Sequence, residues 1–444
     1  MQDVKHLTQK KKRLLHRLVS GNSGSSCNAF RRQNEQRPPR SRKRLAIFVA
    51  GLALIAGLFM SLTLATRSAV SSVGKAVPTP SSEELNTWNS FQVAAQQLSS
   101  FQPVGSRLQA GLPGGGTITY AINPELQERV KRVMDDNRVP FGVFVALEPR
   151  TGKILAMASH STRDTAWPGK AFYTPYPMAS LFKIVTAAAA LEEKKISPDT
   201  VMAFNGKLTS VSPSIWEPRR RYSQEMSLTE AMGKSVNPVF GRLASDVVGR
   251  EPLLQYAGRF GFNQVLFPGT QIQPSIAATP QNTAELMLMG AGLGREVKIT
   301  PLHAAALIGA LANGGTLMAP LLADEIKSGK GTTVYQAQPH PLRRAISTET
   351  AGNLAKMLST TVSSGTSRRA FHDRRGRPML GSISIAAKTG SIDGKDPEGH
   401  YSWFAAYAPI ENPQIALVAL VVNQGKWKIK ATHIGEKALE TFFR

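Results

Sequence analysis

A serine and a lysine three residues apart, Ser180 and Lys183, are the residues whose types and spacing indicate chemistry most directly. They open the apolar run SLFKIVTAAAALEE, whose pattern is helical, and side chains at i and i+3 lie on one face of a helix. A serine hydroxyl becomes a good nucleophile only when a neighbouring base takes its proton. Lysine can be that base when burial or nearby positive charge lowers its pKa from about 10.4. The pair therefore predicts nucleophilic catalysis by Ser180, with N–H groups at the helix start available to a developing oxyanion.

The spacing alone is weak, because Ser72 and Lys75 share it within a stretch rich in Ser, Gly and Pro. The sequence context distinguishes Ser180 from Ser72, since a long apolar helix follows Ser180 and a loop rich in Pro and Tyr precedes it. Further along the chain, Ser235 and Asn237 stand at a break between two helical patterns. The Ser235 hydroxyl could pass a proton to a leaving amine, and the Asn237 amide could hold a peptide backbone.

A third element, Lys388-Thr389-Gly390, ends the apolar strand SISIAA. The ammonium of Lys388 and the hydroxyl of Thr389 could bind a carboxylate, and Gly390 would let a substrate lie close to the strand. Similar triplets occur elsewhere, but Lys327-Ser328-Gly329 falls in a polar turn. The order and context of the three elements carry the prediction.

In this order the three elements resemble S-x-x-K, S-x-N and K-T-G, the set that marks penicillin-binding proteins and serine β-lactamases. Longer stretches resemble the transpeptidase domain of penicillin-binding proteins over roughly residues 117–444, among them VFVALEPRTGKILAMAS, YPMASLFKIVTAAAALE and AAKTGS. The departures from the family pattern are small, with Ala179, Leu181, Ala387 and Ser391 in place of Gly, Thr, Gly and Thr.

This resemblance implies a role for each matched residue. Ser180 would be acylated, Lys183 would be its base, and Ser235 would relay protons with Lys183. The substrate would contact Asn237, Lys388, Thr389, Gly390 and Ser391, and the N–H groups of Ser180 and Ser391 would form the oxyanion hole. The resemblance implies stem peptides of peptidoglycan and β-lactams as ligands, and no cofactor or metal.

Several fates of an acyl-enzyme remain open within this superfamily. A transpeptidase hands the acyl group to an amine, whereas a D,D-carboxypeptidase or a β-lactamase hands it to water. Class A β-lactamases use a Glu about 35 residues after S-x-N, and this chain has no acidic residue between Glu251 and Glu285. A β-lactam sensor would need further spans or an output domain. The comparison favours a short, monofunctional class B-like D,D-transpeptidase beside a separate glycan polymerase.

Strands at both ends of the domain must bring these groups together. ITYAI, FGVFVALE and KILAMAS have strand patterns, as do SISIAAK, SWFAAYAP and QIALVALVVN near the C-terminus, and the segment between is largely helical. We therefore predict an α+β fold, in which N- and C-terminal strands form one antiparallel sheet flanked by helices. The sequence is divided into a domain at 116–444 and a linker at 66–115, which is rich in Ser, Gln, Gly and Pro.

The N-terminal residues indicate a membrane anchor. Residues 45–65 form 21 uncharged, mostly apolar residues, enough for a transmembrane helix. Residues 1–44 hold 13 of the 54 Lys and Arg residues and two acidic ones, so this tail is predicted to stay in the cytoplasm with the domain outside the plasma membrane. A basic amphipathic helix on lipid and a solvated tail both fit residues 4–20, and specific nucleic-acid binding does not. The single cysteine, Cys27, lies in this tail, which excludes a thiol enzyme and disulfides in the exported part.

Overall fold

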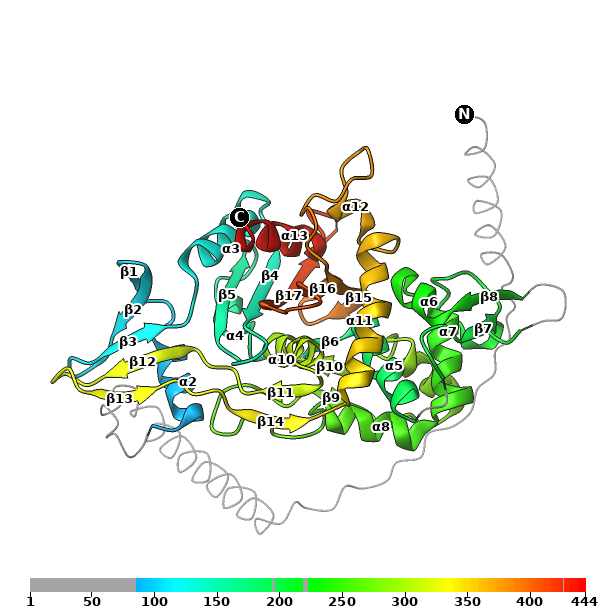
Figure 1. Ribbon diagram of the computed structural model, residues 1–444, viewed down its shortest axis with the longest axis horizontal. Helices are drawn as coiled ribbons and strands as arrows, with labels where there is room; N and C mark the ends of the chain where they lie inside the picture. Colours follow the sequence, from blue (N-terminus) through cyan, green and yellow to red (C-terminus); the bar gives the residue numbers. More distant parts are fainter. Residues whose placement is uncertain (1–84, 194–195, 219–222, 426) are drawn as a thin grey trace, which may run out of the picture. The chain divides into compact units, whose positions relative to one another are not determined.

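The main sheet of the protein joins strands from both ends of the domain. The computed structural model describes residues 85–193, 196–218, 223–425 and 427–444 (Figure 1). Over these residues the main sheet is antiparallel, with the order β15-β16-β17-β4-β5. Its strands are β4 (Phe141–Leu147), β5 (Ile154–Ser161), β15 (Ala386–Lys395), β16 (Glu398–Ala408) and β17 (Ile415–Asn423). The two ends meet where β17 pairs with β4, Val418 lying opposite Val145. The predicted α+β fold is confirmed.

Both faces of this sheet are covered. Every residue of β4 and β17 is buried, as expected for strands with packed elements on each side. Because side chains alternate along a strand, Phe144 and Leu417 face one layer while Val143 and Val418 face the other. Helices α3 (Pro124–Asp136) and α13 (Ala431–Phe442) cover the first face, and α10 (Pro301–Ala312) covers the second (Figure 1).

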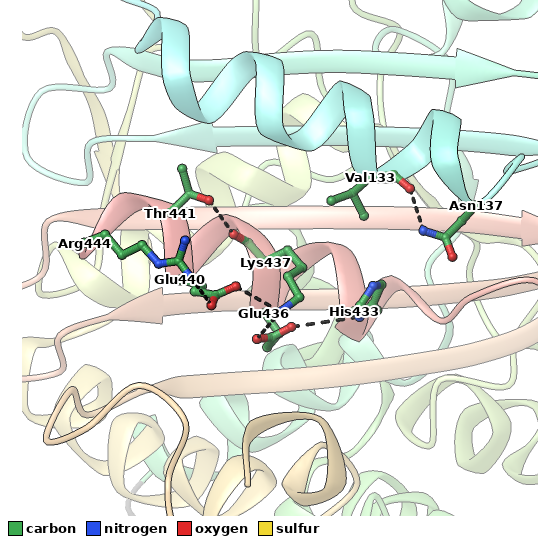
Figure 2. Close-up of polar contacts among 8 residues, drawn as sticks. All are labelled: Val133, Asn137, His433, Glu436, Lys437, Glu440, Thr441 and Arg444. Carbon is green, nitrogen blue, oxygen red and sulfur yellow. Dashed lines mark hydrogen bonds and ion pairs between the residues drawn. The ribbon is translucent and has the colours of Figure 1, made fainter. Parts of the chain in front are cut away.

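Helix α13 carries a chain of ion pairs beside α3, shown in Figure 2. Lys437 Nζ lies 2.9 Å from Glu440 Oε2 and 3.3 Å from Glu436 Oε1, and Arg444 pairs with Glu440. Glu436 is almost fully buried, and burial raises the pKa of its carboxyl. The network sits on the face of the sheet opposite α10.

Capping residues begin and end the helices. The Asn123 side chain accepts the Leu126 N–H at 3.0 Å, and Pro124 is the first residue of α3. Helix α10 ends at Ala312, where Gly314 and Gly315 take positive φ and the Gly315 N–H donates to Ala310 O. The turn at residues 149–152 connects β4 and β5, which pair antiparallel with a register shift between Ala146 and Leu147.

The middle of the chain is largely helical, with short strands between the helices. After β5 come α4 (Trp167–Lys170) and β6 (Tyr176–Pro177), and the side chains of Trp167 and Tyr176 pack in the core. The remaining helices here are η1 (Ala179–Phe182), α5 (Lys183–Glu192), η2 (Pro213–Ile215), α6 (Leu228–Lys234), α7 (Asn237–Arg242), η3 (Leu243–Val248), α8 (Arg250–Arg259), α9 (Thr283–Gly290), α11 (Thr348–Ser363) and α12 (Arg368–Phe371). The short strands are β7 (Val201–Phe204), β8 (Gln224–Ser227), β9 (Ile276–Ala277), β10 (Val297–Ile299), β11 (Thr316–Met318) and β14 (Pro341–Arg344).

The predicted linker is partly wrong, because folded structure begins well before Gly116. Within residues 85–115 lie α2 (Thr87–Gln96), β1 (Gln102–Val104) and β2 (Arg107–Gly111). The strands β1 and β2 join β3 (Thr117–Tyr120), β12 (Ala323–Lys327) and β13 (Thr333–Gln336) in a separate sheet of order β1-β2-β3-β12-β13. Hence ITYAI does not belong to the main sheet. The turn residues that suggested a linker lie between short helices and strands. One of these, α2, buries Phe91 and Ala94.

The predicted tail and transmembrane helix, residues 1–44 and 45–65, lie outside the described residues. Among the described residues, no helix has the length and apolar character needed to cross a membrane.

Candidate active site

The nucleophile candidate, Ser180, lies on the 3₁₀ turn η1, directly before α5. Ala179 before it has a φ of +53°, a left-handed conformation that is uncommon outside glycine. Strained backbone of this kind persists only where surrounding structure holds it. Gly292 provides that support, because a Cβ added there would lie 2.3 Å from Ala179 O and 2.8 Å from Ser180 Cα. The turn leaves Ser180 9% exposed, enough for a small reacting group to reach it.

Lys183 is fully buried and has three polar contacts. Its Nζ lies 2.7 Å from Ser180 Oγ and 2.8 Å from Asn237 Oδ1, and it also forms a hydrogen bond with Ala291 O. Burial lowers the pKa of Lys183 well below its ordinary value, and the nearby charge of Lys388 lowers it further. Both effects favour the neutral amine, whose nitrogen has a lone pair.

The contacts of Lys183 match this neutral state. Asn237 Oδ1 and Ala291 O can only accept hydrogen bonds, so they occupy the two N–H groups of a neutral amine. The remaining lone pair then points to Ser180, whose hydroxyl can turn and donate to it. Such an arrangement can remove a proton from Ser180 as its oxygen attacks a carbonyl carbon.

Asn237 and Ser235 stand at the junction of α6 and α7. Helix α6 ends at Lys234, and Ser235 follows it with a φ of +57°. This left-handed residue turns the chain so that Asn237 begins α7 with its side chain buried. Asn237 Nδ2 donates to Ser210 O at 3.1 Å, which fixes the amide so that its oxygen faces Lys183.

Lys388 is the second fully buried lysine of the site. Its Nζ donates to Ser235 Oγ at 2.8 Å and to Thr389 O at 2.8 Å. Burial lowers the pKa of Lys388 to about 7, so this amine retains part of its charge at neutral pH. Ser235 is thus joined to Lys388 by a hydrogen bond, whereas Lys183 contacts Ser180 and Asn237.

The strand β15 presents the remaining predicted residues along its open edge. It is the terminal strand in the order of the main sheet, so one side of its backbone is unpaired by β16. A Cβ added to Gly390 would lie 3.1 Å from Ala179 Cβ, which shows how close β15 passes to η1. Thr389 and Ser391 flank this glycine, and Ser391 is exposed. The structure therefore places all eight predicted residues on η1, α5, the α6–α7 junction and β15.

Sequence reasoning missed four residues that shape the site. Gly292 and Ala291 support Ser180 and Lys183, Ser210 orients Asn237, and Thr366 Oγ1 lies 2.7 Å from Thr389 Oγ1. The glycines of MGAGLG at 289–294 were a signal of close backbone approach. Thr366 and Ser210 lie in polar loops, where nothing in the sequence separates them from neighbouring hydroxyl residues.

In the part of the chain that the structure describes, no group of three or more His, Cys, Asp or Glu side chains is close enough to hold a metal ion.

Comparison with known proteins agrees with this geometry. The sequence pattern described as the penicillin binding protein transpeptidase domain matches residues 142–440. The chain is 28% identical over 365 residues to the peptidoglycan D,D-transpeptidase PbpA of Mycolicibacterium smegmatis, covering 72% of this chain and 70% of that protein. It is also 28% identical over 342 residues to the stage V sporulation protein D of Bacillus subtilis, covering 70% of this chain and 50% of that one.

Solved structures agree as well. The D,D-transpeptidase domain of a peptidoglycan glycosyltransferase from Eggerthella lenta superposes with a TM-score of 0.63 at 25% identity, covering 79% of this chain and 90% of that one. The penicillin G acyl-enzyme complex of penicillin-binding protein A from M. tuberculosis superposes with a TM-score of 0.62 at 26% identity, covering 75% and 82%. Since the family pattern spans well over half of its length, the chain belongs to the penicillin-binding protein transpeptidase family.

Proposed function

We propose that this protein is a peptidoglycan D,D-transpeptidase that cross-links stem peptides through an acyl-enzyme on Ser180 and is acylated by β-lactams at the same residue. The observation that carries the proposal is the set of contacts of Lys183. The two N–H groups of its neutral amine have acceptors in Asn237 and Ala291, and its lone pair faces Ser180 Oγ. The PbpA relative, a peptidoglycan D,D-transpeptidase by name, and the penicillin G acyl-enzyme of a related structure support it.

Acylation follows from this geometry. The lone pair of Lys183 Nζ takes the Ser180 hydroxyl proton while Ser180 Oγ forms a bond to the carbonyl carbon of the penultimate D-alanine. The N–H groups of Ser180 and Ser391 stabilise the oxyanion. When the intermediate collapses, the C–N bond breaks and the leaving amine of the terminal D-alanine takes a proton from Ser235, which Lys183 replaces. The products are free D-alanine and an ester on Ser180.

Lys388 and Thr389 position the substrate for this step. The charge of Lys388 and the hydroxyl of Thr389 bind the terminal carboxylate, and the Asn237 amide binds the peptide backbone. In a β-lactam, the ring carboxylate takes the place of the D-alanine carboxylate. An amine of a second stem peptide then attacks the carbonyl carbon of the ester and gives a proton to Lys183. The bond to Ser180 Oγ breaks, and Lys183 returns the proton to the Ser180 oxygen.

Hydrolysis of the ester would make the protein a carboxypeptidase or a β-lactamase, and the site favours transfer to an amine. Efficient hydrolysis needs a base for water. In the described part of the chain, no carboxylate hydrogen-bonds to Ser180, Lys183 or Lys388. The chain also has no acidic residue between Glu251 and Glu285.

The proposed enzyme acts at the outer side of the plasma membrane. Residues 1–44 form its cytoplasmic tail, residues 45–65 its single transmembrane helix, and the transpeptidase domain lies outside. The uncharged run at 45–65 behind a basic tail supports this topology. A separate glycan polymerase supplies the strands that it cross-links.

Fluorescent penicillin tests the proposal. We expect the full-length protein to be labelled, Ser180→Ala to lose labelling completely, and Ser359→Ala, which changes a half-buried serine on α11, to label like the wild type. Labelling that persists for many minutes supports a transpeptidase, and release within seconds supports a β-lactamase. Equal labelling of Ser180→Ala would contradict the assignment of the nucleophile.

A further inference from the structure

An exposed tryptophan, Trp427, lies on the connection between β17 and α13. Among the described residues, the large apolar side chains that remain strongly exposed are aliphatic or methionine except for Trp427, which is 47% exposed. The ring is nevertheless held in place. His400 packs edge-on against it with 4.5 Å between ring centroids, and Lys430 Nζ lies 5.7 Å from its centroid. An aromatic face fixed in this way loses little entropy when it binds a ligand.

The pocket beside Trp427 has the chemistry of a sugar site. Its volume is about 310 Å³, and its lining combines one aromatic ring with carboxylates, an amide, an imidazole and glycine backbone. The lining residues are Asp393, Gly394, Glu398, Gly399, His400, Asn423, Gly425 and Trp427. A sugar ring can place its C–H face on an indole ring while its hydroxyls donate to carboxylates. One apolar platform with a few polar groups is the usual composition of a small-ligand site.

The pocket is connected to the active site through β15. Asp393 is two residues beyond Ser391 on this strand, or roughly 7 Å at the rise of an antiparallel strand. His400 lies opposite Asp393 on β16, and its Nδ1 is 2.7 Å from Asp393 Oδ1. A second cavity of about 490 Å³ lies at the same end of the strand and shares Asp393, Gly394 and Glu398 with the pocket.

The direction of the substrate follows from the proposed function, on which this inference rests. With its terminal carboxylate at Lys388 and Thr389 and its reacting carbonyl at Ser391, a donor peptide must run antiparallel to β15. Its amino-terminal part then lies past Ser391, toward Asp393 and Lys395. In peptidoglycan a stem peptide is attached to the glycan by its amino end, so the sugar lies at this end of the strand.

We propose that Trp427 and the pocket beside it bind the glycan at the amino end of the donor stem peptide. The occupant is an uncharged or weakly acidic amino sugar ring, stacked on Trp427 and hydrogen-bonded to Asp393 and Glu398. The neighbouring Lys428 would also suit a tryptophan inserted at a membrane surface. The carboxylates that line the pocket disfavour anionic lipid headgroups, which is why the sugar is the better match.

Two donor substrates test the proposal on the full-length protein in detergent. One is a pentapeptide ending in D-Ala-D-Ala, and the other is the same peptide attached to its disaccharide. We measure kcat/KM for D-alanine release from each. We expect the wild type to prefer the disaccharide donor about tenfold, the upper range for one aromatic stacking contact. Trp427→Ala should reduce this ratio to about one, and Trp427→Phe, which keeps an aromatic face, should retain most of it.

The controls separate this inference from the proposed function. Val265→Ala removes an exposed apolar side chain from another loop and should leave the ratio unchanged. An unchanged ratio in Trp427→Ala, or no preference in the wild type, would overturn the glycan site. Loss of D-alanine release from both donors by the wild type would instead overturn the proposed function. In proteoliposomes, brominated lipid quenches the fluorescence of a tryptophan that is inserted in the membrane. Quenching of the protein's tryptophan fluorescence that disappears in Trp427→Phe would place the ring in the membrane and also overturn the proposal.

Discussion

At the scale of single residues, the site depends on two buried lysines with lowered pKa values. Burial lowers the pKa of both, and the charge of Lys388 lowers the pKa of Lys183 further. This combination suits the chemistry, because a base acts as a neutral amine and a carboxylate-binding group acts as a cation. The sequence could predict which residues the fold brings together, since their types and order are distinctive. It could not predict their charges, which depend on how deeply the fold buries them.

The pH dependence of acylation follows from Lys388. A lysine whose pKa is lowered to about 7 is charged below that pH and neutral above it. We therefore expect the second-order rate constant for acylation by penicillin to fall as the pH rises from about 7 to 9, because the carboxylate loses its cationic partner. Stopped-flow acylation at several pH values measures this. In Lys388→Arg the charge persists at all these pH values, so the fall should vanish, whatever the absolute rate. A rate constant that rises across this range would contradict the assignment.

At the scale of elements, the site is a meeting point of turns and an edge strand. Local signals mark the start of α3, the end of α10 and the turn between β4 and β5, because caps and turns depend on a few adjacent residues. They failed for residues 85–115, where α2, β1 and β2 are short and their partners lie elsewhere. The strand β3, for example, pairs with β12, about two hundred residues further along the chain. Such pairing leaves no mark in a local pattern.

Gly292 should be essential to the shape of the nucleophile turn. Its φ is +70°, and a Cβ there would lie 2.3 Å from Ala179 O. We expect Gly292→Ala to displace Ser180 and to lower the penicillin acylation rate by at least tenfold, a loss of about 1.4 kcal/mol or more in transition-state stabilisation. The measurement is the acylation rate constant at pH 7.

A second glycine provides the matched control for this change. Gly352 lies inside α11, and a Cβ there would meet nothing within 4 Å. Gly352→Ala should leave acylation unchanged and raise the free energy of unfolding by roughly 0.5–1 kcal/mol, because alanine loses less backbone entropy in a helix. If Gly292→Ala acylated as fast as Gly352→Ala, the supporting role of Gly292 would be wrong.

At the scale of the whole molecule, residues 85–115 belong to the folded domain. The hydroxyl of Tyr120 donates to Ala94 O at 2.9 Å, and the ring of Phe101 packs on Tyr120 with 5.8 Å between centroids. Phe91 and Leu108 are buried in the same core. A domain boundary at Gly116 would leave these contacts without partners.

Two truncations test this boundary. A protein that begins at residue 85 should retain the thermal stability of the domain, whereas one that begins at residue 116 should unfold at a lower temperature. The loss of two buried apolar side chains alone corresponds to roughly 3–6 kcal/mol. Differential scanning calorimetry measures both, and penicillin labelling reports whether each remains folded. If the two truncated proteins had equal melting temperatures, residues 85–115 would be a linker after all.

The pairing of β17 with β4 has a consequence for when the protein becomes reactive. Residues 162–385, which include Ser180, lie between the two halves of the main sheet, and Lys388 follows them. A ribosome delivers β4 and β5 first and β15 to β17 last, so the sheet cannot close until nearly the whole chain has emerged. Contacts between such distant segments form late in folding. Until then Ser180 lacks the second lysine and the strand edge against which a peptide is held, so a nascent chain has no means of reacting with the wall or with an antibiotic before its last strands arrive.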